Sequence, residues 1–251
     1  DLIPPGDTAP PPDSEAPPDA TDPPPCQGPG LFGQVVQEDG TPIGGTKLFL
    51  CGVVNGAETC NPRTADASGR FSFQALAPGY THLEVNATLA GIQLGTQFAG
   101  YSLQVDPSGP DCVDMGLITL PELPAGDAMA TAAGGTVTAG PVTVELPAGC
   151  PVFPDFSPEA PVGVLLLDDP AAAYWAPPGT VLAVAFHPFK AHCAAGAAVR
   201  LDGTAGLAAP RVLYNDLLEG GATDAGPMVA DRGGWVLEAA VPDLTWIWIT
   251  D

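Results

Sequence analysis

The stretch Leu31-Phe-Gly-Gln-Val-Val-Gln37, the turn Asp39-Gly40 and the run Thr46-Lys-Leu-Phe-Leu-Cys51 decide the fold. The two runs are short, rich in β-branched and aromatic residues, and separated by turn residues, which is typical of strands. Asn55-Gly56 follows directly, and both central positions of a two-residue hairpin turn need a positive φ that Asn and Gly tolerate. The stretch therefore predicts β-hairpins.

Short β-rich runs continue at regular spacing along the chain, which is typical of β-sandwiches. In the first half they cover residues 71–73, 83–85, 97–105 and 113–120. In the second half they cover residues 136–138, 142–146, 162–167, 181–186, 199–201, 211–214, 235–237 and 245–250. We predict an all-β protein: two tandem antiparallel β-sandwiches preceded by an extended Pro-rich arm. The expected boundaries are an arm at 1–30, a sandwich at 31–122, a small-residue linker at 123–133 and a second sandwich at 134–251.

The charge of the chain is strongly acidic. It has 29 Asp and Glu against 7 Lys and Arg, a formal net charge of −22, and 45% hydrophobic residues that can form a core. Such an excess repels nucleic-acid phosphates and anionic lipid head groups, which argues against both as partners. The uncharged stretch of residues 170–189 is interrupted by Pro177, Pro178, Gly179 and Pro188, so we predict no membrane span.

Six cysteines without a Cys-x-x-Cys pair favour three disulfides over zinc or redox chemistry. Disulfides point to an oxidising compartment, so we expect an exported, bacterial-type protein, extracellular or on the cell surface, numbered from its mature N-terminus. Six cysteines allow 15 connectivities. The pairing we predict joins Cys51 to Cys60 across a hairpin, Cys26 to Cys112 around the first sandwich, and Cys150 to Cys193 within the second.

The first half carries an ordered series of turn and strand motifs. They are Gly33-x-Val35, Asp39-Gly40-x-Pro42-Ile43, Asp66-Ala-Ser-Gly69-Arg-Phe71, Leu76-Ala-Pro78-Gly79-Tyr80 and Asp114-x-Gly116-x-Ile118-x-Leu120. Over about residues 30–122 this series resembles the carboxypeptidase regulatory-like domain, a prealbumin-like sandwich common in bacterial surface proteins. The resemblance implies a sandwich fold and an extracellular location, and it implies no catalytic residues.

The second half resembles another sandwich family. The motifs are Gly134-Gly135-Thr-Val137, Leu146-Pro-Ala-Gly149, Pro188, Leu207 and Val212-Leu-Tyr214. Over about residues 134–251 they look like the ZU-type domain of ankyrins and netrin receptors. The resemblance places Cys193 at an apolar core position, which supports its pairing with Cys150. Some relatives cleave themselves at a His-Phe-Ser site, but Pro188 and Phe189 follow His187 here, so self-cleavage is not carried over.

Catalytic chemistry finds little support in the sequence. There are only six serines, no Gly-x-Ser-x-Gly elbow, and every cysteine is assigned to a disulfide. Asp168-Asp169 could suggest a glycosidase pair, but neighbouring residues in a strand point to opposite faces. We predict no catalytic residues and no enzymatic activity.

Metal and cofactor sites are equally sparse, and we predict none. His187 and His192 lie near Cys193, but a structural role beside a disulfide is the favoured interpretation. Calcium is the better candidate metal. A loop with four oxygen-bearing side chains could bind it, although the spacing is not that of an EF-hand and an acidic surface loop is preferred: Asp106, Ser108, Asp111 and Asp114.

The last run, Thr245-Trp-Ile-Trp-Ile-Thr250, is apolar on both faces, with Trp246 and Trp248 on one and Ile247 and Ile249 on the other. Either both faces are buried within the chain or one meets a partner. In the second case the tryptophans form an interface or a sugar-stacking platform.

The arm suggests the function. Residues 1–30 hold 11 prolines, favour polyproline II and could be a spacer or a connector. Our leading hypothesis is a non-enzymatic structural subunit of an extracellular filament or surface layer, whose arm docks on a neighbouring copy with Leu2 and Ile3 as anchors. The alternative is a cell-surface module that binds carbohydrate or another envelope component.

Overall fold

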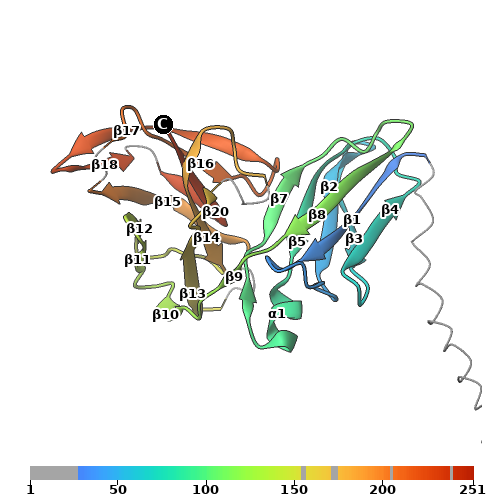
Figure 1. The fold of residues 1–251 in the computed structure, drawn as a ribbon, viewed down its shortest axis with the longest axis horizontal. Helices are drawn as coiled ribbons and strands as arrows, with labels where there is room; N and C mark the ends of the chain where they lie inside the picture. Colours follow the sequence, from blue (N-terminus) through green and yellow to red (C-terminus); the bar gives the residue numbers. More distant parts are fainter. Residues whose placement is uncertain (1–27, 154–156, 171–174, 204–205, 238–239) are drawn as a thin grey trace, which may run out of the picture.

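The fold is known from a computed structural model that describes residues 28–153, 157–170, 175–203, 206–237 and 240–251. The described chain is almost entirely β-structure, arranged as two units side by side (Figure 1). The all-β prediction is confirmed. The Pro-rich arm, with Leu2 and Ile3, lies outside the described residues.

The first unit consists of two facing sheets around one core. One sheet has the order β4-β1-β8 and the other the order β3-β2-β5-β7. The apolar side chains between them include Leu31, Leu48, Phe73 and Leu83, all inaccessible to solvent. The strands are β1 (Gly30–Val36), β2 (Lys47–Val54), β3 (Ala57–Thr64), β4 (Arg70–Gln74), β5 (Tyr80–Asn86), β7 (Tyr101–Gln104) and β8 (Cys112–Thr119).

One pairing in this unit departs from the expected antiparallel pattern. Strands β1 and β8 are parallel, with Leu31 opposite Val113 and Val35 opposite Ile118. A parallel neighbour needs a long crossover connection, and here most of the unit lies between the two strands. The predicted hairpin is present: Asn55 and Gly56 have φ values of 54° and 81°, and β2 pairs with β3 around them.

A short helix, α1 (Thr88–Leu94), interrupts the strands of the first unit and was not predicted. It ends where Gly95, at a φ of 75°, donates its N–H to the carbonyls of Gly91 and Ile92. A short strand β6 (Gln97–Phe98) follows and pairs with β9 (Glu122–Leu123), beyond the end of β8. Helix α1 protrudes below the strands near the second unit (Figure 1).

The second unit is one 11-stranded sheet with the order β10-β13-β14-β20-β16-β17-β18-β15-β12-β11, and β19 also pairs with β15. Its ends approach each other, because a Cβ on Gly135 of β11 would lie 2.9 Å from Met129 Cε of β10. The strands are β10 (Asp127–Ala130), β11 (Gly135–Ala139), β12 (Val142–Leu146), β13 (Glu159–Leu166), β14 (Thr180–His187), β15 (Ala191–Asp202), β16 (Arg211–Asn215), β17 (Ala222–Asp231), β18 (Gly234–Leu237), β19 (Val241–Leu244) and β20 (Trp246–Thr250).

The segment expected to be a linker takes part in the second unit. Strand β10 lies within residues 123–133 and pairs with β13, placing Asp127 opposite Val162. The small residues that suggested a linker fit a short edge strand equally well, and Met129 is buried. The second unit therefore follows the first almost directly: β9 ends at Leu123 and β10 begins at Asp127.

Two predicted disulfides are present. Cys51 is bonded to Cys60 across the β2–β3 hairpin, and Cys150 is bonded to Cys193 within the second unit. Cys112 is also disulfide-bonded, whereas its predicted partner Cys26 lies outside the described residues.

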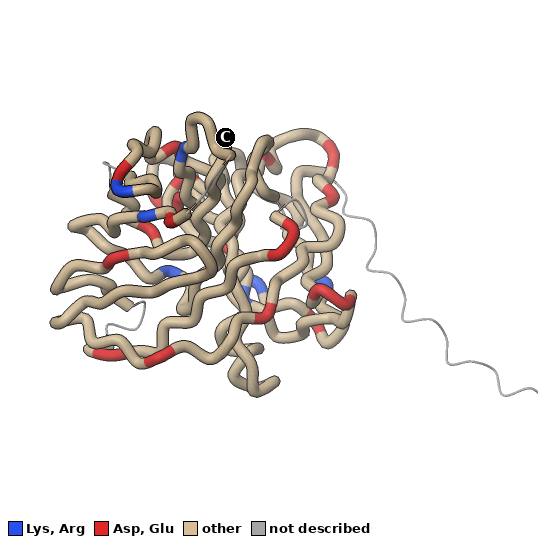
Figure 2. Tube along the Cα trace, turned by 60° about the vertical axis from the view of Figure 1, so that its left-hand side comes forward, with Lys and Arg blue, Asp and Glu red and all other residues tan. Residues whose placement is uncertain are grey.

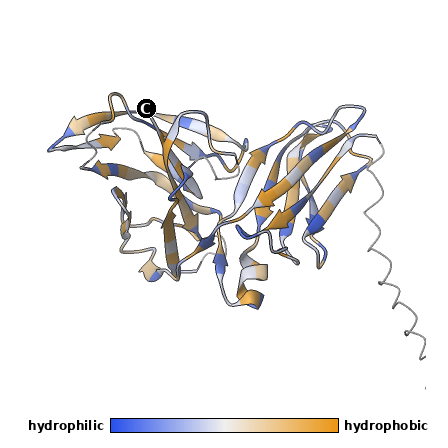
Figure 3. Ribbon diagram, viewed as in Figure 1, coloured by the Kyte–Doolittle hydropathy of each residue, from blue (hydrophilic) through white to orange (hydrophobic). Residues whose placement is uncertain are grey.

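The surface charge reflects the composition. Acidic residues occur along both units and few Lys or Arg lie among them (Figure 2). Apolar residues alternate with polar ones along many strands, as expected for half-buried sheets (Figure 3). Within the described ranges, no helix has the length and apolar character needed to cross a membrane.

Candidate functional site

The two units meet where β20 of the second packs against β7 of the first. The rings of Tyr101 and Trp246 are stacked with centroids 4.8 Å apart, and Trp248 stacks beyond Trp246 at 6.1 Å. The indole N–H of Trp246 donates a hydrogen bond of 2.8 Å to the carbonyl of Gly100. Both tryptophan side chains are 0% exposed, and Ile247 on the opposite face belongs to the core of the second unit.

This packing decides between the two interpretations of the last strand. Both of its faces are buried within the chain, which was the first alternative. The prediction that Trp246 and Trp248 form an interface with another molecule, or a sugar-stacking platform, is wrong for this reason. The first unit occupies the face on which a partner or a sugar would have to lie.

A buried amide joins the two units beside the tryptophan stack. Asn215, at the end of β16, accepts a hydrogen bond of 2.8 Å from Ser102 N and donates one of 2.7 Å to Ser102 O. The side chain thereby satisfies the outward amide and carbonyl of β7, which is the last strand of its sheet. Gly221 N also donates to Ser102 O, at 2.9 Å. No signal in the sequence marks Asn215 as a contact.

A groove with ionisable side chains opens along one side of the junction. Its cavity volume is about 720 Å³, and we call it the junction groove, defined by Glu84, Phe153, Lys190, His192, Leu217 and Asp243. Lys190 Nζ lies 2.7 Å from the buried Glu84 Oε2, so this ion pair links the two units. His192 Nδ1 lies 2.8 Å from Asp243 Oδ1, and Leu217 N donates to the other oxygen of Asp243.

These ion pairs and hydrogen bonds connect the walls of the groove to one another. Each buried carboxylate already has a partner, so neither is placed as a free general base. Burial raises the pKa of the nearby Tyr214 above its ordinary value, with Asp216 and Asp243 adding to the effect, so this hydroxyl is held in its neutral form. We find no nucleophile and base in hydrogen-bond contact among the described groove residues.

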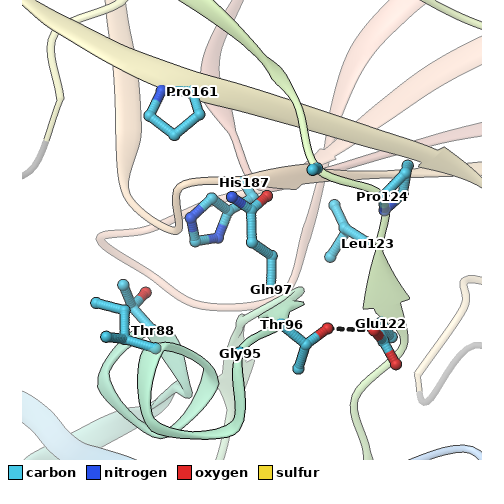
Figure 4. A pocket seen from close by; sticks show the side chains of 11 residues that line it. Thr88, Gly95, Thr96, Gln97, Glu122, Leu123, Pro124, Pro161 and His187 are labelled. Carbon is cyan, nitrogen blue, oxygen red and sulfur yellow. Dashed lines mark hydrogen bonds between the residues drawn. The ribbon is translucent and has the colours of Figure 1, made fainter.

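A second cavity lies at the foot of helix α1, where the two units also meet. We call it the helix-side pocket; its volume is about 480 Å³ and its defining residues are Thr88, Ile92, Gln97, Glu122, Pro161 and His187 (Figure 4). His187 comes from the end of β14, Gln97 from β6 and Glu122 from β9. The pocket therefore combines side chains from strands that are distant in the sequence.

Two buried acceptor atoms of the helix-side pocket have no hydrogen-bond partner among the described residues: Nδ1 of His187 and Oε1 of Gln97. His187 is only 8% exposed. Burial lowers the pKa of His187, and a hydrogen bond to the carbonyl of Phe98 opposes this shift only in part. The ring is consequently neutral near pH 7, with Nδ1 available to accept. On the rim, the Thr96 hydroxyl donates to the Glu122 carboxylate.

The metal sites considered from the sequence do not assemble. His187 and His192 lie in different cavities, and Cys193 is in a disulfide. In the proposed calcium loop, Asp106 accepts from the amide and hydroxyl of Ser108, and these bonds lower the pKa of Asp106. Asp114 accepts from Gly116 N. These are local turn contacts, in line with the preferred interpretation as a surface loop.

One group of potential metal ligands is present within the described ranges. Ligand atoms of Cys51, His82 and Glu84 lie within 4.8 Å of one another. The Cys51 sulfur is bonded to Cys60 and cannot act as a thiolate, and Glu84 is paired with Lys190. The donor set therefore does not fit a metal ion.

The likenesses of this chain to known proteins are structural and of limited extent. No family model matches the sequence, and no curated protein matches it. A solved structure of 5-hydroxyisourate hydrolase from Klebsiella pneumoniae is similar over 38% of this chain and 89% of its own, with 20% identity and a TM-score of 0.28. A 9R-lipoxygenase from Cyanothece is similar over 39% of this chain and 17% of its own, with 15% identity and a TM-score of 0.26. At these TM-scores neither likeness carries an argument about function.

Proposed function

We propose that the protein is a non-enzymatic, exported structural subunit that assembles with copies of itself at the cell surface. The observation that carries the proposal is the outward face of helix α1. Three of its seven residues are large, apolar and exposed: Leu89 at 54%, Ile92 at 69% and Leu94 at 56%. Grouped exposure of this kind marks surfaces that become covered by a partner.

The character of α1 favours a protein partner. The helix has no charged residue, although the chain as a whole is highly charged, so this part of the surface lacks the repulsion that a net charge of −22 imposes elsewhere. Its inner side packs against strand β6, because a Cβ on Gly91 would lie 3.5 Å from the Phe98 ring. The helix thus turns Ala90 and Gly91 toward the core and presents its leucines and isoleucine outward.

The closely packed junction between the units supports a structural role. A subunit that bears load must transmit it between its parts. The Trp246 stack, the Asn215 hydrogen bonds and the Lys190–Glu84 ion pair all cross the junction. The resemblance of residues 30–122 to the carboxypeptidase regulatory-like family adds support, since that family is common on bacterial surfaces. In the proposal the N-terminal arm, with Leu2 and Ile3, is a second connector between copies.

Electron microscopy and size-exclusion chromatography of the purified protein test this function. We expect polymers for the natural sequence and monomers for the triple variant Leu89→Gln, Ile92→Gln, Leu94→Gln. The matched control is Val53→Gln with Leu117→Gln, which replaces two apolar side chains exposed singly on β2 and β8. Removal of residues 1–25 tests the arm in the same assay. A natural protein that stays monomeric, or polymers that persist in the triple variant, would overturn the proposal.

A further inference from the structure

We propose that the helix-side pocket binds a primary ammonium group, brought by a small amine or an amino sugar. A buried acceptor without a hydrogen bond destabilises a folded protein, so a pocket that gathers several of them is completed by a ligand that brings donors. His187 Nδ1 and Gln97 Oε1 are both buried, and neither has a partner among the described residues.

The register of the sheet brings these acceptors to one place. Gly163 of β13 lies directly opposite His187 of β14, and residues opposite each other in an antiparallel pair face the same side. A Cβ on Gly163 would lie 2.8 Å from both Gln97 Oε1 and Pro124 O. The imidazole, the amide oxygen and the backbone carbonyl therefore share one face. Figure 4 shows the His187 and Gln97 side chains together in the pocket.

The acceptor set matches the donors of an ammonium. Three N–H groups on one nitrogen can be satisfied by the Nδ1 lone pair, the amide oxygen and the carbonyl oxygen. Glu122 on the rim supplies a negative charge, and no Lys or Arg belongs to the described lining. A neutral hydroxyl ligand could meet the same acceptors but would gain nothing from the Glu122 carboxylate.

The other residues that line the pocket limit the size and the chemical character of the ligand. Ile92, Leu123 and Pro161 provide apolar walls suited to a short alkyl chain or one face of a sugar ring. A cavity of about 480 Å³ accommodates a small molecule of either kind. The site is separate from the outward face of α1 except at Ile92, so the inference does not depend on the proposed self-assembly.

The test uses the whole protein and two amines, putrescine and D-glucosamine, with 1,4-butanediol and D-glucose as neutral counterparts of matching shape. Binding is measured by isothermal titration, and the ¹⁵N shifts of the His187 ring are followed in parallel. We expect at least one amine to bind and to move the Nδ1 resonance, and neither neutral counterpart to do so. Which amine binds distinguishes an alkyl amine from an amino sugar.

Variants locate the site. Glu122→Gln removes the charge without changing the shape and should weaken amine binding about tenfold, as expected for a charge-assisted contact. His187→Phe removes the buried acceptor and should abolish the response. Glu145→Gln, an exposed carboxylate on β12, is the matched control and should bind as the natural protein does. Absence of amine binding, equal binding of the neutral molecules, or an unchanged affinity in Glu122→Gln would overturn the inference, and Glu122→Gln keeps the test decisive if His187→Phe does not fold.

Discussion

Tyr101 and Trp246 belong to different units of the fold and nevertheless form a single parallel stack, with ring centroids 4.8 Å apart and an interplanar angle of 9°. In addition, the indole N–H of Trp246 donates a hydrogen bond to the carbonyl of Gly100, the residue before Tyr101. Aromatic pairs of this geometry stabilise contacts beyond the area they bury. The junction is therefore built like the interior of a domain.

The two stacked tryptophans should respond differently to the same substitution. Trp246 donates to Gly100 O, whereas Trp248 Nε1 is buried and has no partner among the described residues. Trp246→Phe leaves the Gly100 carbonyl unsatisfied and should lower the free energy of unfolding by about 1–3 kcal/mol more than Trp248→Phe. Urea denaturation of the two variants measures the difference, and equal losses would contradict the assignment.

Asn215 should be intolerant of replacement by Leu, which has a similar size. The variant Asn215→Leu leaves Ser102 N and O without their amide partner inside the junction, and we expect a loss of about 2–5 kcal/mol from several broken hydrogen bonds. Limited proteolysis between the units should accelerate. The exposed amide of Gln74 on β4 offers a control, because Gln74→Leu should leave both readouts nearly unchanged.

Gly100→Ala tests how closely the units approach. A Cβ at this position would lie 2.5 Å from the Phe189 ring of the second unit and 2.7 Å from Val85 O. Removing this steric overlap requires a shift of the backbone or of Phe189, so we expect a destabilisation of about 1–3 kcal/mol in thermal or urea unfolding. Gly109→Ala, where the nearest atom would be 3.9 Å away, should be tolerated.

Acidification should weaken the fold through two buried histidines. Burial lowers the pKa of His187 and of His82 below 6.5; Lys190 adds to the shift at His82, while Glu84 and Asp216 oppose it. As the pH falls through 6.5, the unfolded chain binds protons that the folded chain does not. The free energy of unfolding must therefore fall below that pH and level off beneath the folded-state pKa values.

Urea unfolding at about pH 7.5 and about pH 5 measures this loss. The double variant His82→Gln, His187→Gln should show a smaller difference between the two pH values than the natural protein. A double variant with the same pH dependence would show that other groups cause it.

The two described disulfides should differ in their contribution to stability. The Cys51–Cys60 bond spans 9 residues and the Cys150–Cys193 bond spans 43. From the entropy of the closed loops alone, replacing each pair by Ser should cost about 2.5 and about 4 kcal/mol. Denaturation of the two double-Ser variants gives the order, and a larger loss for the short loop would contradict the loop-entropy account.

The strands could be predicted because alternation and turn residues are local properties. Leu31 to Val35 and the Asn55-Gly56 turn show this directly. The parallel pairing of β1 with β8 could not be predicted, because no local pattern states which distant strand lies alongside. Helix α1 escaped prediction because it is short, contains Gly91 and begins without a side-chain cap.

The candidate site could be predicted less well than the strands, because it is made by contacts between residues that are distant in the sequence. The two-sided apolar character of β20 was visible in the sequence, but what covers the Trp246 face is decided by β7 of the other unit. Gln97 and His187 belong to no common sequence motif. They meet because Gln97 lies against Gly163 of β13, and the pairing of β13 with β14 places Gly163 opposite His187.

The side-chain amide of Asn215 restricts how this fold can evolve. Because it completes the open edge of β7, each unit depends on the other for hydrogen bonds at this edge. A recombination event that exchanged one half for a foreign sandwich would leave Ser102 and the Tyr101 ring facing water or an ill-fitting neighbour. The two halves must accordingly be inherited together, and substitutions on either side of the joint are constrained by the other.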